Sequence, residues 1–370
     1  MSARLMIPGP VELETVVLET LAQPAVPHYG AGWVAIHNET IGLLQQVFKT
    51  HGRVYMLPGS GTLAVDAAVH STFLPGETVI VGNNGWFGER LISVLTANGV
   101  RVVPVVVDPR QPLVAAAFAE ALNAHPEASG VALVHLETST SVLNPVREIA
   151  ALVRTHYPDK LLMIDAVTGL AGADLLTEEW GIDLCVSASQ KALGAPAGLG
   201  LVGLSDRAWA KIEARPEVPR SWYLDLKRWQ WYVEHEADWH PFPVTMPTSI
   251  VLALRVALHS LFQQGLERRM AHYRQMAARL RAGLRAQGMT LFADETAMAN
   301  TITAAYCPPG ITAPEIRDYL LKECNIQITT GFGPYKQDVI RIGHMGGALD
   351  LEDIDHLLAG IAACLERIPS

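Results

Sequence analysis

The sequence predicts an α/β protein: a large domain with a mainly parallel sheet flanked by helices, followed by a smaller α+β C-terminal domain. From about residue 50 to 205, short β-rich segments alternate with longer segments whose apolar residues have helical spacing. A shorter series of strand-like and helical segments follows a long helical tract. The length of 370 residues also favours two domains, because single domains typically contain roughly 100–200 residues.

The expected elements of the large domain follow one another in a strand–helix order that favours parallel pairing. The strands are expected at Val79–Val81, Val102–Val107, Val131–Leu136, Leu161–Ile164, Leu184–Val186 and Leu199–Leu204. The helices are expected at Thr62–Phe73, Phe87–Ala97 and Val146–Tyr157. In a parallel sheet the ligand site lies at the carboxyl ends of the strands. The polar and Gly-rich segments that follow the strands are therefore the candidate sites of chemistry.

The C-terminal part is expected to begin with a long helical tract from Ser249 to Gln287 that bends near Gly265. After it we expect strands at Thr301–Ala305, Ile326–Thr329 and Val339–Ile342, and helices at Ala313–Glu323 and from about Leu351. This divides the chain into an N-terminal segment at 1–18, a large domain at 19–250 and a small domain at 251–370. Residues 208–247 are rich in tryptophan and proline and lack a clean period, so we interpret them as an interface.

The composition argues against several classes of protein. There are 28 Lys and Arg against 37 Asp and Glu, a formal charge of −9, which disfavours nucleic acid or an anionic membrane as partner. The four cysteines form no CxxC pair, which argues against a disulfide framework or a zinc ribbon. No window of about 18 apolar residues predicts a membrane span, and the N-terminus lacks the pattern of a signal peptide. We expect a cytoplasmic protein.

A single lysine stands in the segment Ser187-Ala188-Ser189-Gln190-Lys191-Ala192-Leu193-Gly194-Ala195-Pro196, which otherwise contains no charge. The segment lies between two expected strands, where a parallel sheet would bury it. A buried lysine has a lowered pKa, and the neutral amine is the nucleophile that attacks a carbonyl carbon. The alternative is a surface lysine in a loop.

Two further segments follow expected strands. Asp165 ends the apolar run from Leu161 and is either a turn residue or an acid that pairs with a cationic ring nitrogen. Gly59-Ser60-Gly61-Thr62 precedes an Ala-rich helix, whose free N–H groups and dipole form a good phosphate site. The alternative is an ordinary capped helix start.

Two motifs match known patterns only superficially. Gly198 to Gly203 reads GxGxxG, but it lies within an apolar strand pattern and not at the start of a helix. His235 to His240 resembles HExxH with one residue too many, so the two histidines would not share a helix face. We therefore expect neither a dinucleotide fingerprint nor a metal site.

The phosphate site, the aspartate and the lysine, in this order and at these spacings, resemble the fold-type I pyridoxal-phosphate enzymes. The closer resemblance is to the class V aminotransferases, which include the alanine–glyoxylate and serine–pyruvate aminotransferases. It extends from Pro8-Gly9-Pro10 to Arg341-Ile342-Gly343, and the run from Ser189 to Pro196 is its most specific element. The resemblance implies pyridoxal 5'-phosphate as cofactor and a homodimer.

The resemblance also implies roles for individual residues. Lys191 would be the catalytic residue and would bind the cofactor covalently, while Asp165 would pair with the ring nitrogen. Val167 would pack on one face of the ring, and Phe87 would stack on it, with Trp86 as the alternative. Thr138 would contact the phenolic oxygen. The phosphate would be held by Ser60, Gly61, Thr62 and Gln190, and by Thr245 from the other subunit.

The substrate site implied by the resemblance contains Arg341, whose fork binds a carboxylate in two places, and Gly9, which leaves room. His28, Tyr29 and His344 are further candidates there. Phe242 stands where alanine–glyoxylate enzymes often have a tyrosine, which removes one phosphate contact.

The implied activity is a ping-pong transfer of an amino group from alanine or serine to glyoxylate or pyruvate. Other class V donors, namely pyridoxamine, aminoethylphosphonate and ureidoglycine, are alternatives. A cysteine-desulfurase-like lyase is another, although such enzymes usually carry His before the lysine, where this chain has Gln190, and need a mobile cysteine. A binding protein without the cofactor is the alternative from a different class.

Overall fold

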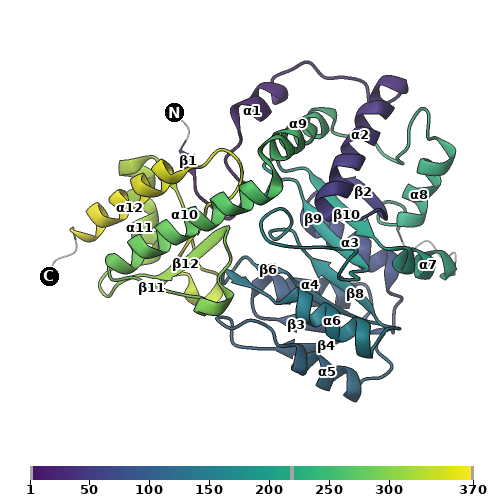
Figure 1. Cartoon of the computed structure of the whole chain (residues 1–370), viewed down its shortest axis with the longest axis horizontal. Coiled ribbons are helices and arrows are strands. Elements are labelled where there is room, and N and C mark those ends of the chain that lie inside the picture. Colours follow the sequence, from purple (N-terminus) through teal and green to yellow (C-terminus); the bar gives the residue numbers. More distant parts are fainter. Residues whose placement is uncertain (1–2, 217–220, 368–370) are drawn as a thin grey trace.

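The computed structural model describes residues 3–216 and 221–367 (Figure 1). A seven-stranded sheet forms the larger part, in the order β2-β10-β9-β8-β5-β3-β4. Neighbouring strands run parallel except at β10, which is antiparallel to β2 and β9. The predicted mainly parallel sheet is confirmed. Its strands are β2 (Arg53–Pro58), β3 (Thr78–Asn83), β4 (Arg101–Val106), β5 (Gly130–Val134), β8 (Leu161–Asp165), β9 (Leu184–Ala188) and β10 (Leu199–Leu204).

The centre of this sheet is dry. Every residue of β3, β5, β8, β9 and β10 is buried. Strands that are covered on both faces read as continuous apolar runs, which is the pattern that the sequence displays at these positions. The GxGxxG match, Gly198 to Gly203, lies on β10 and the residue before it, as expected, and not at a helix start.

Helices pack on this sheet and position its loops. Helix α3 packs against β9 and β10, α4 packs against β3, β4 and β5, and α2 packs against β2. The helices of this part are α1 (Thr15–Leu21), α2 (Ala31–Phe48), α3 (Gly61–Thr72), α4 (Trp86–Ala97), α5 (Ala115–Ala124), α6 (Val146–His156), α7 (Asp206–Ala214) and α8 (Leu226–His235). The segment 208–247 therefore contains most of α7 and all of α8. Its role as an interface stays a prediction.

The long helical tract is two helices, α9 (Thr248–Gln264) and α10 (Leu266–Ala286), which meet at an angle of 85° at Gly265. The predicted bend is confirmed, and the positive φ of 85° at Gly265 suits a residue without a side chain. Among the described residues, no single helix has the length and hydropathy to cross a membrane, and only this bent pair passes that test jointly.

A four-stranded sheet in the order β11-β12-β15-β14 forms the C-terminal part, beside the large sheet (Figure 1). The N-terminal strand β1 pairs with β13, so the chain start lies against this part. The domain limits drawn from the sequence stay a prediction. The elements are β1 (Arg4–Leu5), β11 (Thr290–Leu291), β12 (Ile302–Tyr306), α11 (Ala313–Cys324), β13 (Ile326–Gln327), β14 (Thr329–Thr330), β15 (Val339–Gly343) and α12 (Leu351–Leu365), with 3-10 turns at Glu295–Ala297 and Gly333–Tyr335. A short hairpin, β6 (Leu136–Glu137) and β7 (Val142–Leu143), follows β5.

Candidate active site

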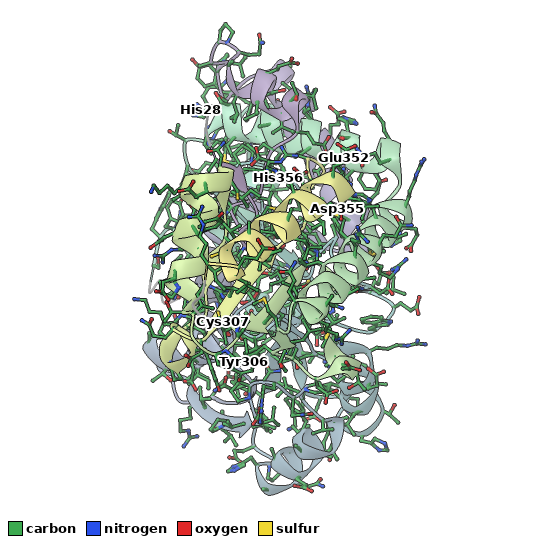
Figure 2. All side chains as sticks on the ribbon, turned by 90° about the vertical axis from the view of Figure 1, so that its left-hand side faces the viewer. His28, Tyr306, Cys307, Glu352, Asp355 and His356 are labelled. Carbon is green, nitrogen blue, oxygen red and sulfur yellow. The ribbon has the colours of Figure 1, made fainter. Side chains whose placement is uncertain are left out.

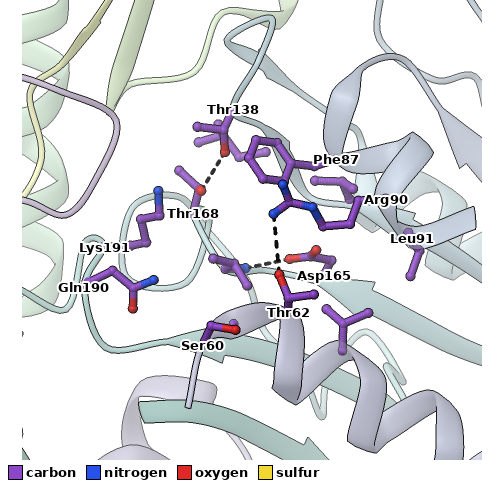
Figure 3. A pocket seen from close by; sticks show the side chains of 15 residues that line it. Ser60, Thr62, Phe87, Arg90, Leu91, Thr138, Asp165, Thr168, Gln190 and Lys191 are labelled. Atoms are coloured by element: carbon purple, nitrogen blue, oxygen red, sulfur yellow. Dashed lines mark hydrogen bonds between the residues drawn. The ribbon is translucent and has the colours of Figure 1, made fainter. Parts of the chain in front are cut away.

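Two cavities meet at the carboxyl ends of the strands, where the sequence predicted the chemistry. The first has a volume of about 230 Å³ and the second of about 470 Å³, and Phe87, Thr138 and Lys191 line both. The first also contains most of the expected cofactor residues (Figure 3): Ser60, Gly61, Thr62, Asp165, Val167 and Gln190. The second contains both expected substrate residues, Gly9 and Arg341.

Lys191 lies in the loop after β9 and points between the two cavities. Burial, followed by the positive charge of Arg341, lowers the pKa of Lys191 from 10.5 to about 8. Its Nζ donates a hydrogen bond to the carbonyl oxygen of Pro8. A Cβ atom at Gly9 would lie 2.5 Å from that Nζ, so no larger residue fits there unless the lysine moves. With a pKa of about 8, a fraction of this buried amine is uncharged near neutral pH, and the uncharged form is available for covalent chemistry.

Asp165 is the last residue of β8 and is only 8% exposed. Burial is the largest cause that raises the pKa of Asp165 from 3.8 to about 6, and the negative charge of Glu137 adds to it. The Val167 amide opposes this shift because it donates to Asp165 Oδ1 at 3.0 Å. A carboxylate in this environment favours a positively charged partner, because the partner would offset the cost of burying its charge.

The start of α3 forms the end of the first cavity at which the phosphate group is expected to bind. Ser60 caps the helix, with its Oγ accepting from the Leu63 amide at 3.3 Å. A Cβ atom at Gly61 would lie 2.9 Å from Val167 Cγ2, so glycine allows the helix to approach Val167 closely. The first N–H groups of a helix have no intrahelical partner, and in the described structure the buried amide oxygen of Gln190 has none either. The N–H groups at the helix start can donate to an anion, whereas the Gln190 oxygen can only accept a hydrogen bond from a donor.

Arg90 is a residue of this cavity that the sequence did not single out. Its guanidinium lies 4.7 Å from the centre of the Phe87 ring and donates to Thr62 Oγ1 at 3.4 Å. In the part of the chain that the structure describes, it forms no ion pair with a carboxylate. Its position in the sequence could have indicated this location, because Arg90 follows Trp86 and Phe87 by about one helical turn.

Glu137 is a second residue that the sequence did not single out. It is fully buried, and burial is the largest cause that raises its pKa. Its Oε2 accepts from the amides of Phe87 and Gly88, each at 3.0 Å, and its Oε1 accepts from the Ser139 amide at 2.9 Å. Because Gly85 supplies no side-chain cap to α4, this distant carboxylate caps the helix instead. It thereby positions Phe87 next to Thr138, which hydrogen bonds to Thr168 at 2.7 Å between the hydroxyl oxygens.

Arg341 lies on β15 and is only 4% exposed. Its Nε donates to the Thr330 carbonyl at 2.9 Å and its Nη1 to the Thr138 carbonyl at 3.1 Å. Burial lowers the pKa of Arg341 to about 10, and among the described residues no carboxylate forms an ion pair with it. A buried guanidinium without an acidic partner is costly, and a bound carboxylate would relieve that cost.

Several expected residues lie outside both cavities. Thr245 is exposed on the loop before α9 and lines neither cavity of its own chain. His344 is fully buried against Thr303, so it does not approach the substrate cavity as suggested by its position beside Arg341. His28 and Tyr29 pack against His240 and Trp239 instead. Trp86 lines neither cavity, which favours Phe87 as the ring-stacking residue.

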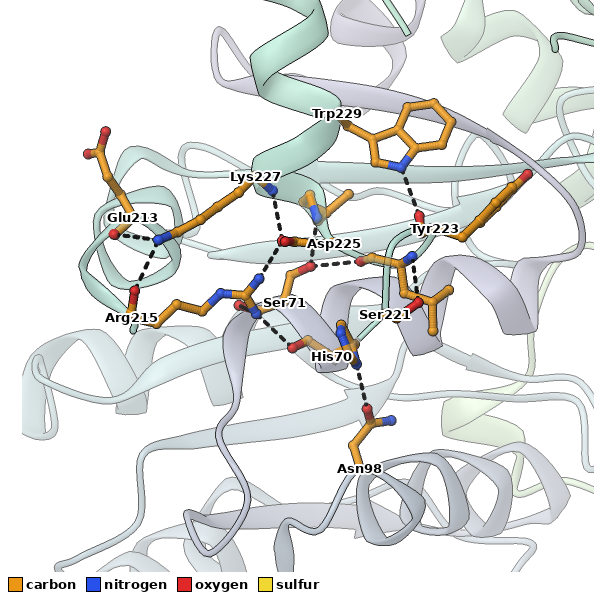
Figure 4. A network of polar contacts seen from close by, with 12 residues as sticks. His70, Ser71, Asn98, Glu213, Arg215, Ser221, Tyr223, Asp225, Lys227 and Trp229 are labelled. Carbon is orange, nitrogen blue, oxygen red and sulfur yellow. Dashed lines mark hydrogen bonds and ion pairs between the residues drawn. The ribbon is translucent and has the colours of Figure 1, made fainter. Parts of the chain in front are cut away.

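A polar network packs against the end of α3 (Figure 4), and one further hydrogen bond lies just before its start. Tyr223 donates from its hydroxyl to the Pro58 carbonyl at 2.8 Å, immediately before the Gly59–Thr62 turn. Ser71 Oγ donates to the Leu224 carbonyl at 2.9 Å, and Arg215 donates to the Ser71 carbonyl at 2.8 Å. The Trp- and Pro-rich segment 208–247 therefore supports α3, whose start forms the expected phosphate-binding end of the first cavity.

The comparisons with known proteins identify the family of the chain. The model of the family described as "Aminotransferase class-V" matches residues 20–357. Alanine–glyoxylate aminotransferase of Oryctolagus cuniculus is 32% identical over 98% of this chain and 92% of its own length. (S)-Ureidoglycine–glyoxylate transaminase of Bacillus subtilis is 30% identical over 98% of this chain and 90% of its own length.

Solved structures agree as well. Ureidoglycine–glyoxylate aminotransferase from Bacillus subtilis superposes with a TM-score of 0.94 at 30% identity, covering 100% of this chain and 94% of that one. The fold and the site define a pyridoxal-phosphate-dependent enzyme. More narrowly, the chain belongs to the class V aminotransferase family.

Proposed function

We propose that this enzyme moves the amino group of a small amino acid, alanine or serine, to glyoxylate or pyruvate by a ping-pong mechanism. One observation carries the proposal. Lys191, with its lowered pKa, stands between a cavity lined by the buried Asp165 and a cavity lined by the buried Arg341, which has no carboxylate partner among the described residues. A single carboxylate clamp suits a monocarboxylic donor. Relatives named for alanine and glyoxylate support the same choice of substrates.

The residues of the first cavity fit pyridoxal phosphate. When bound, this cofactor supplies an aldehyde that reacts with amines and a ring that accepts the electrons of a broken C–H bond. The phosphate would be held by the free N–H groups at the start of α3 and by the side-chain NH2 group of Gln190, because both can donate hydrogen bonds to an anion. Asp165 would pair with the ring nitrogen, Val167 and Phe87 would pack on the ring faces, and Thr138 would contact the phenolic oxygen.

The protein side chains then perform the steps around the cofactor. Arg341 binds the donor carboxylate through its free N–H groups and orients the Cα–H bond. Lys191, released when the donor amine takes its place, would accept the proton from the donor Cα and hold it for return within the same half-reaction. Its pKa of about 8 suits both transfers, because the amine can hold and release a proton near neutral pH.

The proposal extends to a homodimer in which Thr245 reaches the phosphate site of the partner subunit. Its support is the exposure of Thr245 in a segment that closely follows the half-exposed Trp239. The cytoplasmic setting stays a prediction.

The lyase alternative has less support. Cys307 lies beside Tyr306 at the end of β12 (Figure 2), and it lines neither cavity, as is also true of Cys324. Burial raises the pKa of both thiols, whereas a nucleophilic cysteine needs a lowered one.

The proposal is tested by incubating the purified protein and pyridoxal phosphate with a panel of donors and acceptors. The panel contains alanine, serine, cysteine, pyridoxamine, aminoethylphosphonate and ureidoglycine, each with glyoxylate and with pyruvate. We expect the highest kcat/KM for alanine or serine and no turnover by Lys191→Ala. A higher value for another donor would overturn the substrate choice, and sulfide release from cysteine without transamination would favour the lyase.

A further inference from the structure

The ring of Phe332 lies where the two parts of the chain meet at the substrate cavity. Phe332 precedes the 3-10 turn Gly333–Tyr335 and lines the second cavity. Its ring stacks on Trp86, with centroids 5.2 Å apart and an interplanar angle of 9°. It meets the Phe87 ring edge-on at 6.2 Å. Trp86 and Phe87 both belong to α4, the helix that packs on the large sheet. The contact with Phe332 therefore joins α4 to the C-terminal part.

The same ring also contacts the carboxylate-binding arginine. The Arg341 guanidinium lies 4.2 Å from the Phe332 ring centre, a cation–π distance. Stacked aromatic pairs and cation–π contacts each resist displacement of the ring. Because Trp86, Phe87 and Arg341 all contact it, the Phe332 ring is held in place as a wall of the second cavity.

The three aromatic side chains, Trp86, Phe87 and Phe332, are not part of the hydrophobic core. Trp86 is 46% exposed, and Phe332 and Phe87 are partly exposed. None of the three belongs to a buried hydrophobic cluster of the described residues. Phe87 and Phe332 line the second cavity, so their packing contributes to the shape of that cavity.

The position of the wall relative to the chemistry defines what it would contact. A donor whose carboxylate lies on Arg341 and whose amine faces Lys191 occupies the space between these two residues, next to the Phe332 ring. The remaining lining of this cavity contains no acidic side chain, so the donor side chain meets mostly uncharged or cationic walls.

We propose that Phe332 is a specificity-determining residue, which limits the size of the side chain that the amino donor can carry. The proposal rests on the proposed transamination and on Arg341 as the carboxylate site. A fixed wall discriminates by steric exclusion, and one extra or missing methylene group typically changes kcat/KM by roughly 10–200-fold. Shortening the wall should therefore admit larger donors more than it harms small ones.

The experiment compares wild type with Phe332→Leu and Phe332→Ala, each loaded with pyridoxal phosphate. The kcat/KM is measured for alanine and for leucine with the same acceptor. We expect the leucine-to-alanine ratio to rise at least about 10-fold in Phe332→Ala and less in Phe332→Leu. Phe292→Leu is the matched control, because Phe292 packs against Tyr335 away from both cavities and should leave the ratio unchanged.

A binding measurement separates this role from a structural one. Propionate and 4-methylpentanoate carry the side chains of alanine and leucine without the reactive amine, and calorimetry gives their Kd values for each variant. We expect Phe332→Ala to shift the ratio of the two Kd values toward 4-methylpentanoate. Equal weakening of both ligands, or an unchanged donor ratio in an active enzyme, would overturn the proposal. Absence of transamination in wild type would instead refute the proposed function.

Discussion

Arg341→Lys tests the carboxylate site, because it keeps the positive charge but removes the two-pronged guanidinium. Two of the five N–H groups of Arg341 already donate to the carbonyls of Thr330 and Thr138. The others are free to bind a carboxylate in two places. A lysine would lose one of these charge-assisted bonds, a cost of roughly 1.5–3 kcal/mol, which corresponds to a rise in KM of about 10–150-fold.

The assay follows steady-state transamination of alanine by wild type and variant, with kcat and KM determined separately. Arg317→Lys is the matched control, because Arg317 lines the same cavity but already forms an ion pair with Asp318 at 2.7 Å. We expect its KM to change by less than about threefold, since exposed ion pairs contribute little. If Arg341→Lys changed KM no more than Arg317→Lys, the assignment of Arg341 to the donor carboxylate would be refuted.

Three further predictions concern the supporting residues. Glu137→Gln replaces one of the two acceptor oxygens with an NH2 group, which would face backbone N–H donors and lose their hydrogen bonds. It should therefore weaken cofactor binding about 10-fold, measured by titration of the visible absorption band, and unchanged affinity would argue against its role at α4. Tyr223→Phe should weaken binding of pyridoxal phosphate about fivefold but not that of pyridoxal, because the hydroxyl supports only the phosphate end, and equal effects on both would contradict this. Because the pKa of Lys191 is about 8, the rate of cofactor uptake should rise with pH and level off above pH 8 as the neutral amine predominates; a rate still increasing above pH 9.5 would be inconsistent.

The elements that the sequence predicted well are those whose burial leaves a local pattern. The continuous apolar runs of β3, β5, β8, β9 and β10 reflect strands covered on both faces. The direction of β10 leaves no such pattern, because the same apolar run fits either orientation. Helix α8 was missed because it is short and carries Trp and charged residues on several faces.

The candidate site could be predicted where its residues follow strands in short motifs, as Asp165 and Lys191 do. Glu137 and Tyr223 act through contacts across 49 or more and 165 positions of the chain, which no local motif records. Phe332 was missed for the same reason, since its partners lie on α4 and β15. His344 illustrates the opposite error: closeness to Arg341 in the sequence did not place it in the cavity.

The covalent role of Lys191 is tested most directly by incubating the protein with pyridoxal phosphate, fixing the link with borohydride and locating the added mass by peptide mapping. Our account predicts one modified residue per chain, on the peptide that contains Lys191, and no visible absorption band in Lys191→Ala. Modification mainly of other lysines, or a full band in that variant, would contradict it.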